Sequence, residues 1–225
     1  MTRKTILVTG GTRGIGKAIC RELAPNYHLL VGGTCRARVD EACNSLESAE
    51  PFVCDLTNLT DLEKAVSAIH TLDGVVLNAG MAFSGLIEEV THDDWVRMLT
   101  LNVVAQADLI RLTLPALRRS RGQIIAINSG SGFRASPGSS AYAASKFALR
   151  ALTDAVREEE RGIVRVSSIH PGRVDTDMQV ELQTAAGKPY HPDDHMRPES
   201  VARAVRLALD TTEDATVEVV SVRPI

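Results

Sequence analysis

Short runs of apolar, mostly β-branched residues alternate along the chain with longer stretches of helical periodicity. The short runs predict strands at residues 5–8, 28–31, 52–54, 74–77, 122–127, 163–169 and 217–222. The longer stretches predict helices at residues 15–24, 40–46, 59–69, 94–117, 140–159 and 200–209. Strands and helices alternate strictly, and the strands are apolar. The chain is therefore expected to form an α/β fold, a doubly wound Rossmann-type parallel sheet of about seven strands with helices on both faces.

One domain over residues 1–225 is expected, because the length suits a single sizeable core and no repeat or linker divides the chain. Residues 176–197 lack clear periodicity and are rich in Gly, Pro, His and Asp. They follow the strand at 163–169. Because ligands of open parallel sheets bind beyond the carboxyl ends of the strands, this segment is predicted to be a lid that covers the substrate.

Composition argues against several classes of partner. The net charge is −3, no long basic run occurs and aromatic residues make up only 4% of the chain, which disfavours nucleic acid. No apolar segment is long enough to span a bilayer and no secretory leader is evident, so no membrane partner is expected. No cysteine belongs to a CxxC pair, so free thiols in a reducing compartment, the cytoplasm, are expected at Cys20, Cys35, Cys43 and Cys54.

A glycine-rich turn separates the first strand from the first helix, with the spacing Gly-x3-Gly-x-Gly. Glycine permits a sharp turn and close approach to a pyrophosphate, and the helix N-terminus offers free N–H groups and a positive dipole end. The strand–turn–helix context favours dinucleotide binding over a purely structural turn. Cofactor contacts are expected from Gly10, Thr12, Arg13, Gly14, Ile15 and Gly16.

The end of the second strand indicates which dinucleotide is bound. NAD-selective folds place an acidic residue there for the ribose hydroxyl, whereas this chain has Gly33-Thr34-Cys35-Arg36. Arg36 can pair with the additional phosphate of NADP, and Arg13 can approach the same phosphate. The alternative is that Arg36 and Arg38 are solvated surface charges. The sequence predicts NADP(H) in preference to NAD(H).

Tyr142 and Lys146 are four residues apart on a predicted helix, so both side chains project from one face. Hydride transfer to a carbonyl requires a proton donor, and the ordinary tyrosine pKa of about 10 makes it a poor one at neutral pH. A nearby cation stabilises tyrosinate and lowers that pKa. Lys146, together with an oxidised nicotinamide, would therefore bring Tyr142 into the range for general acid–base catalysis.

Five motifs accompany the glycine turn in a fixed order. They are Asn78-Ala79-Gly80 after the fourth strand, Asn102 on the helix at 94–117, Ser129 after the fifth strand, Tyr142-x3-Lys146, and Pro171-Gly172 followed by Thr176. With the turn, which reads TGxxxGxG, they resemble the short-chain dehydrogenase/reductase family over essentially the whole chain. Leu77 stands where the family's NNAG motif has its first Asn. The resemblance implies oxidoreductase activity on a carbonyl or alcohol.

The resemblance implies a catalytic role for four residues. Ser129, thirteen residues before Tyr142, would hydrogen-bond the substrate oxygen, and Ser131 is the alternative in a serine-rich stretch. Lys146 would also hold the nicotinamide ribose. Asn102 would anchor a water that connects Lys146 to solvent. The alternative for Asn102 is a helix-breaking polar residue bonded to backbone.

The resemblance also assigns cofactor contacts outside the glycine turn. Asp55 corresponds to an adenine-contacting residue, although it could instead cap the helix that begins near Leu59. The main chain of Pro171 and Gly172 would border the nicotinamide, and Thr176 would contact its carboxamide. The remaining expected contacts are Leu56, Asn78, Ala79, Gly80, Tyr142, Lys146 and Val174.

The sequence therefore predicts an NADP(H)-dependent carbonyl reductase or alcohol dehydrogenase with Tyr142 as general acid/base. A catalytically silent NADP(H)-sensing protein is the main alternative. An epimerase or dehydratase is disfavoured by the short chain, and a methyltransferase by the Tyr142–Lys146 pair.

Three further expectations concern assembly, substrate contacts and metal binding. Family members commonly assemble through the helices at 94–117 and 140–159, which implies a homotetramer or homodimer. Small-molecule contacts are expected around Phe83, Phe133 and residues 176–197. His191 and His195 could ligate a metal, but Gly187 and Pro192 argue against a regular helix, and no metal is predicted.

Overall fold

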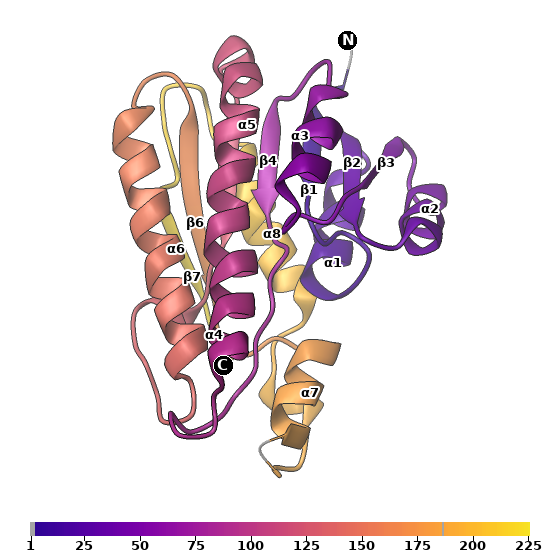
Figure 1. Ribbon diagram of the computed structural model, residues 1–225. Coiled ribbons are helices and arrows are strands. Elements are labelled where there is room, and N and C mark those ends of the chain that lie inside the picture. Colours follow the sequence, from indigo (N-terminus) through magenta and orange to yellow (C-terminus); the bar gives the residue numbers. More distant parts are fainter. Residues whose placement is uncertain (1–2, 186) are drawn as a thin grey trace.

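The computed structural model describes residues 3–185 and 187–225. Seven parallel strands form one sheet in the order β3-β2-β1-β4-β5-β6-β7, and Figure 1 shows them at the centre of the molecule. The strand order reverses between β1 and β4, which places a ligand crevice at that junction. The predicted fold class is confirmed. The strands are β1 Thr5–Val8, β2 His28–Gly33, β3 Ala49–Val53, β4 Gly74–Leu77, β5 Gln123–Ile127, β6 Arg165–Pro171 and β7 Val219–Val222.

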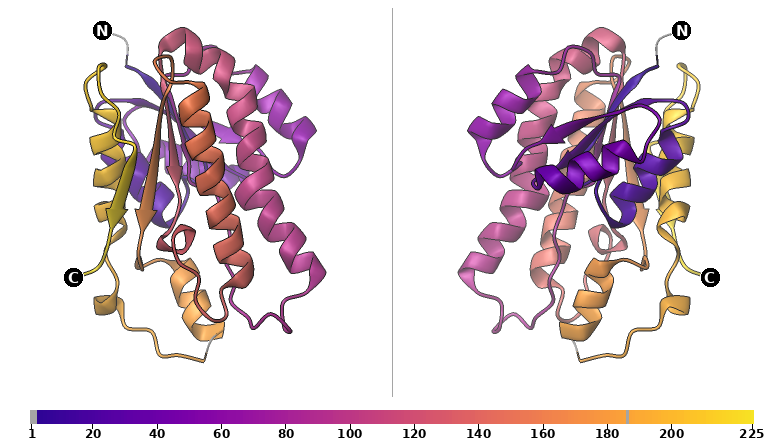
Figure 2. Two further views of the ribbon diagram at one scale, coloured as in Figure 1. Left: turned by 90° about the vertical axis from the view of Figure 1, so that its left-hand side faces the viewer. Right: turned by 90° about the vertical axis from the view of Figure 1, so that its right-hand side faces the viewer.

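Helices cover both faces of the sheet, and alternate residues of the central strands pack against each layer. In β1, Ile6 and Val8 pack with α1 and α8, whereas Leu7 packs with residues of α3, α5 and α6. Figure 2 shows α8 on one side of the strands and α5 and α6 on the other. The helices are α1 Gly14–Leu23, α2 Arg36–Asn44, α3 Leu59–Ser67, α4 His92–Leu99, α5 Ala105–Ser120, α6 Ser140–Glu159, α7 Asp177–Ala185 and α8 Pro198–Leu209.

The helix predicted at 94–117 is longer and less regular than expected. It begins two residues earlier because Thr91 and Asp94 form a capping box, in which the Thr91 hydroxyl accepts from the Asp94 amide at 3.2 Å. A π-helical turn at Thr100–Val104 then separates α4 from α5. Such turns are frequent at functional sites. Asn102 lies in this turn.

Residues 176–197 contain a helix that the sequence did not predict, α7, and a short 3₁₀ turn at Pro192–Asp194. The weak helical amphipathicity of α7 explains the missed element, since none of its residues is buried. The base of the segment is closed by a bridge between Val174 and Met196, with the Asp175 amide donating to the Met196 carbonyl at 2.9 Å. In Figure 1, α7 lies beyond the carboxyl end of the sheet. Ala186, within the predicted lid, lies outside the described residues.

Candidate active site

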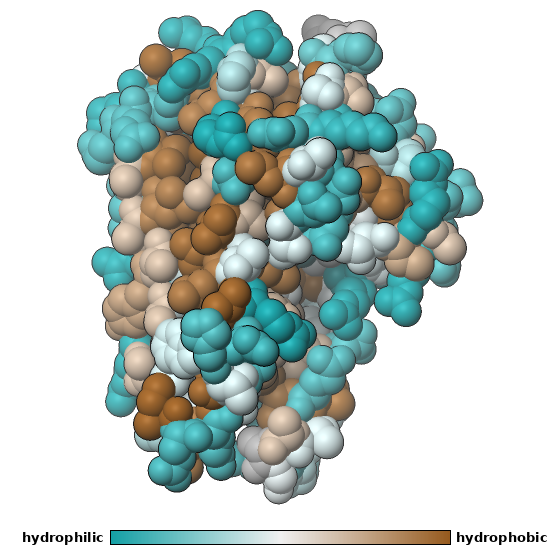
Figure 3. Space-filling model, viewed as in Figure 1, coloured by the Kyte–Doolittle hydropathy of each residue, from teal (hydrophilic) through white to brown (hydrophobic). Residues whose placement is uncertain are grey.

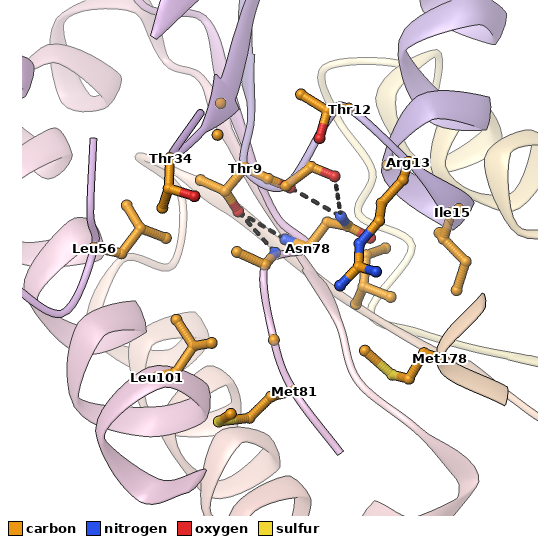
Figure 4. Close-up of a pocket in the computed structure, with 18 of the residues that line it drawn as sticks. Thr9, Thr12, Arg13, Ile15, Thr34, Leu56, Asn78, Met81, Leu101 and Met178 are labelled. Atoms are coloured by element: carbon orange, nitrogen blue, oxygen red, sulfur yellow. Dashed lines mark hydrogen bonds between the residues drawn. The ribbon is translucent and has the colours of Figure 1, made fainter. Parts of the chain in front are cut away.

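A cavity of about 460 Å³ lies at the carboxyl ends of β1, β4 and β5, within the size range of small-molecule sites (Figure 4). It is lined by 29 residues from the glycine turn, the neighbouring strand ends, α2, the π-helical turn, α6 and the start of α7, among them Arg13, Gly16, Arg38, Asp55, Tyr142, Lys146 and Thr176.

The glycine turn is tied to the end of β4 by hydrogen bonds, drawn as dashed lines in Figure 4. The Asn78 side-chain amide donates to the carbonyl of Thr9 at 2.9 Å and to that of Gly10 at 3.2 Å. The Thr9 hydroxyl accepts from the main-chain amides of Asn78 and Ala79, each at 3.0 Å. These contacts form because β1 and β4 are adjacent in the sheet. Asn78, expected to contact the cofactor, thus holds the glycine turn in place through its side-chain amide.

Gly16 forms a cradle that no larger residue fits. A Cβ there would overlap the carbonyl oxygen of Gly10 and lie 2.6 Å from Nδ2 of Asn78. Gly10 and Gly14 adopt positive φ angles of 63° and 50°, which L side chains rarely adopt. Helix α1 begins at Gly14 with no side-chain cap, so its first N–H groups are available to an anion. The turn fits a dinucleotide pyrophosphate.

At the adenosine end, the structure places Arg38, and not Arg36, on the cavity wall. The Arg36 guanidinium lies 2.9 Å from both carboxylate oxygens of Asp40, one turn along α2. The i, i+4 spacing of Arg36 and Asp40 in the sequence was the signal for this pairing. Arg13, Thr34 and the remaining expected turn residues line the cavity.

Asp55 also lines the cavity, and it does not cap α3. Its carboxylate accepts from the amide of Thr57 at 2.9 Å and from the hydroxyl of Thr57 at 2.7 Å. Asn58 is the cap, since its side chain accepts from the Asp61 amide at 3.2 Å. Leu56 lines the cavity beside Asp55, as expected.

Helix α6 brings Tyr142 and Lys146 to the cavity together. The Lys146 ammonium donates to the Ile127 carbonyl at 3.0 Å and lies 5.8 Å from the centre of the Tyr142 ring. Lys146 is 7% exposed, and burial lowers the pKa of its ammonium to about 8. Burial raises the pKa of Tyr142, while a hydrogen bond with the Ser129 side chain lowers it. The sequence predicted that Lys146 lowers the pKa of Tyr142. In the protein without cofactor, burial instead raises the pKa of Tyr142 overall.

Ser129 follows β5 and begins a 3₁₀ turn at Gly130–Gly132. Its hydroxyl oxygen accepts from the Ser131 amide at 3.1 Å, which leaves the hydroxyl proton free to donate. The Ser129 side chain hydrogen-bonds to Tyr142, so Ser129, rather than Ser131, is the serine beside the tyrosine. Asn128, which the sequence did not single out, lines the cavity and accepts from the Ser129 amide at 3.0 Å.

Asn102 is 1% exposed and does not line the cavity. Its side chain bonds to both main-chain groups of Met81 and donates to the Ser145 hydroxyl at 3.0 Å. Gln106, one turn further, donates to the carbonyls of Ala79 at 3.1 Å and Leu101 at 2.9 Å. In the sequence, the only sign of the Gln106 contacts was a glutamine on the apolar face of a predicted helix. Both side chains hold the end of β4 against the π-helical turn.

The remaining predicted residues lie at the end of β6. Thr176 lines the cavity, and its methyl group would be 3.3 Å from a Cβ at Gly14. Pro171, Gly172 and Val174 do not line it, and the Gly172 amide donates instead to the Val222 carbonyl at 2.8 Å. Gly80 does line it.

The expected pocket residue Phe133 does not line the cavity, because its ring packs between His170, at 4.2 Å, and the Arg150 guanidinium, at 4.5 Å. His195 packs on Tyr190 at 4.8 Å and bonds to the His191 carbonyl at 2.8 Å. Residues 3–185 and 187–225 contain no cluster of three or more His, Cys, Asp or Glu placed to hold a metal. Within the same residues, no helix has the length and apolar character that crossing a membrane requires.

Comparison with known proteins identifies the family. The model of the short chain dehydrogenase family matches residues 4–187. An uncharacterized oxidoreductase of Staphylococcus epidermidis is 31% identical, and the match covers 99% of this chain and 97% of the relative. An uncharacterized short-chain type dehydrogenase/reductase of Sinorhizobium fredii is 33% identical, with 97% and 90% covered. The chain belongs to the short-chain dehydrogenase family.

Solved structures match over the full length of the chain. The alcohol dehydrogenase of the archaeon Thermococcus sibiricus, complexed with 5-hydroxy-NADP, superposes with a TM-score of 0.89 at 27% identity and covers 99% of this chain and 97% of its own. A putative NAD(P) dependent gluconate 5-dehydrogenase from Beutenbergia cavernae, with bound NADP, gives 0.88 at 30% identity, covering 100% and 96%. The agreement extends to every layer of the fold.

Proposed function

We propose that this protein is an NADP(H)-dependent oxidoreductase that interconverts a small carbonyl compound and its alcohol. The observation that carries the proposal is that Tyr142 and Lys146 share one cavity with the glycine cradle at Gly16. The adenine and pyrophosphate would lie along residues 10–16 and Asp55, and the nicotinamide near Thr176. The similar structures from Thermococcus sibiricus, complexed with 5-hydroxy-NADP, and Beutenbergia cavernae, with bound NADP, support a nicotinamide cofactor.

A bound nicotinamide would supply a hydride for the carbonyl carbon, and the chain's own residues would bind and protonate the carbonyl oxygen. The Ser129 hydroxyl donates a hydrogen bond to the substrate oxygen, and Tyr142 transfers its proton to that oxygen as negative charge develops. The Lys146 ammonium, held by the Ile127 carbonyl, stabilises the tyrosinate that remains. In the reverse direction, Tyr142 accepts the proton of the alcohol.

The preference for NADP(H) rests on arginines that can meet the additional phosphate. Arg13 and Arg38 line the cavity, and the end of β2 offers Thr34 and Cys35 in place of an acid. We expect Arg38→Ala to weaken NADPH binding about tenfold and NADH binding less than twofold, since one charge-assisted bond to phosphate is lost. Arg36→Ala is the matched control on the same helix. A larger effect for Arg36 would show that its pairing with Asp40 is exchanged for the phosphate.

A substrate panel tests the proposal: aldehydes and ketones with NADPH or NADH, and alcohols with NADP⁺ or NAD⁺. Turnover is monitored by the absorbance of the reduced nicotinamide. Tyr142→Phe should bind NADPH as the wild type does and lose at least about a thousandfold in turnover. Substantial turnover by Tyr142→Phe would refute the assigned mechanism. Tight NADPH binding without turnover of any substrate would favour a silent NADP(H)-sensing protein.

We further propose that the protein forms a homodimer or homotetramer through the α4–α6 side. Apolar side chains are exposed there at Val96, Val104 and Phe147, and Figure 3 shows apolar surface over α5 and α6. Ala144 and Ala151 extend this face along α6, where small side chains permit close approach of a second helix. Family members' assembly through these helices supports the proposal.

A further inference from the structure

A completely buried histidine, His170, lies directly behind the reaction centre at the end of β6. Its Nδ1 lies 2.9 Å from the main-chain oxygen of Ser129, and its Nε2 lies 2.9 Å from the hydroxyl of Ser168. The proposed chemistry does not use this ring. Its two nitrogens are nevertheless both engaged, and one of them bonds to the residue that holds the substrate oxygen.

We propose that His170 is a positioning residue for the reaction, which fixes the main chain of Ser129 so that the Ser129 hydroxyl faces Tyr142. This inference rests on the proposed function. The Ser129 amide is held by Asn128 Oδ1 at 3.0 Å, and the Ser129 carbonyl is held by His170. The Ser131 amide donates to the Ser129 hydroxyl oxygen at 3.1 Å, so both main-chain groups and one acceptor position of the hydroxyl are held in place.

The hydrogen bonds assign the tautomer of His170. A main-chain carbonyl can only accept, so Nδ1 carries the proton. In the neutral ring Nε2 is then an acceptor, and the Ser168 hydroxyl donates to it. His170 itself is 0% exposed, so water is excluded from its ring, and the Phe133 ring packs against it with the two ring centres 4.2 Å apart.

The charges around His170 favour the neutral ring. Burial lowers its pKa, and the guanidinium groups of Arg150 and Arg223 lower it further, whereas the Ser129 carbonyl and Asp154 act in the opposite direction. Arg223 also donates to the main-chain oxygen of His170, which ties the segment after β7 to the same strand end. Burial and the two guanidinium groups therefore favour the neutral Nδ1–H form.

Two substitutions separate positioning from packing. His170→Asn keeps an N–H donor close to the position of Nδ1, whereas His170→Leu keeps the apolar bulk and removes the donor. We expect His170→Leu to lower kcat/KM about tenfold, as the loss of one positioning bond implies, and His170→Asn to recover to within about threefold of the wild type. NADPH affinity, measured by fluorescence titration, should stay within about twofold in both variants.

A double-mutant cycle with Ser129→Ala identifies the route of the effect. If His170 acts through Ser129, His170→Leu should change kcat by less than about twofold once the Ser129 hydroxyl is absent. Multiplication of the two losses, or equal losses for His170→Leu and His170→Asn, would overturn the proposal. His170 would then be a packing residue only.

An NMR experiment tests the same assignment without turnover. Two-bond ¹⁵N–¹H correlations of the His170 ring, assigned by comparison with His170→Asn, should show a protonated Nδ1 and an unprotonated Nε2 from about pH 7 to 9. A protonated Nε2 would overturn the proposal even in an active enzyme. Conversely, the expected tautomer in a protein that reduces no carbonyl would show that the proposed function fails while the geometry of His170 holds.

Discussion

Asn102 and Met81 exchange two hydrogen bonds of 2.9 Å, from the Met81 amide to the Asn102 side-chain oxygen and from the Asn102 side-chain nitrogen to the Met81 carbonyl. The pair joins the segment after β4 to the π-helical turn between α4 and α5. The sequence suggested that Asn102 anchors a water, with backbone bonding as the alternative. The observed side-chain bonds match the alternative. Asn102 does not line the cavity itself, but it holds Met81, which does.

Replacing Asn102 by Asp tests whether the structure depends on the hydrogen bonds between Asn102 and Met81. The carboxylate could still accept from the Met81 amide, but it would face the Met81 carbonyl and lose its donors in a buried site. We expect a loss of about 3 kcal/mol in the free energy of unfolding, with reduced cofactor affinity. Urea denaturation measures it. Asn58→Asp is the matched control, because Asp caps a helix as well as Asn does and stability should hardly change. Equal stability of the two variants would contradict the role of Asn102.

The glycine cradle provides a test that separates backbone strain from cofactor binding. In Gly16→Ala, the added Cβ would overlap the Gly10 carbonyl, so the turn must shift and NADPH affinity should fall at least about a hundredfold by titration. Gly162→Ala is the control. Gly162 has a φ of 81° with nothing within 4 Å of a Cβ, so it should lose about 1 kcal/mol of stability and keep its cofactor affinity.

The fold and the glycine turn could be predicted from the sequence because both depend on local patterns. Apolar runs bounded by turns located all seven strands, and the turn directly follows β1. Tyr142 and Lys146 were predictable for the same reason, since one turn of helix α6 separates them. Helix α7 escaped prediction because its residues lack an apolar face.

The less predictable contacts are those between distant residues. His170 meets the carbonyl of Ser129 only because β5 and β6 are adjacent in the sheet, and the sequence shows no pattern that pairs the two. Arg36 and Arg38 lie two positions apart on α2, so they project in different directions; Arg36 pairs with Asp40, and Arg38 lines the cavity. The Arg36–Asp40 pair could be read from its i, i+4 spacing, whereas the contact between His170 and Ser129 depends on the order of the strands in the sheet.

The pKa of Lys146 predicts a basic limit to carbonyl reduction. Burial lowers this pKa to about 8, so the ammonium is present below pH 8 and is lost as the pH rises through it. Tyr142 stays protonated over that range, because burial raises its pKa. With NADPH saturating, kcat/KM for reduction should be level below about pH 7 and fall about tenfold per unit well above 8. Lys146→Arg, whose charge does not titrate here, should lose this break even if its rate is low. A level profile to pH 10 in the wild type would contradict the assignment.

The predicted lid role of residues 176–197 can be tested at its tether. The Tyr190 hydroxyl donates to the Asp175 carboxylate at 2.6 Å, across the closed base of the segment. Tyr190→Phe removes only this bond, so we expect the KM for the carbonyl substrate to rise about threefold to tenfold with little change in NADPH affinity. Tyr27→Phe is the control, since it removes a similar bond of 2.6 Å, to Asp210, away from the cavity. Equal effects on KM would argue against a lid.

The proposed assembly can be tested by placing charge on the exposed apolar face. Val104 and Phe147 are 53% and 42% exposed, and a glutamate at either position would bring like charges together across a symmetric contact between copies. Val104→Glu and Phe147→Glu should therefore shift the protein toward the 24.2 kDa monomer in light scattering coupled to gel filtration. Ile163→Glu is the control, because Ile163 is 48% exposed but lies in the connection between α6 and β6, away from this face. A wild-type protein that is monomeric at every concentration would remove the assembly proposal, whereas dissociation by Ile163→Glu alone would move the interface to that end of the molecule.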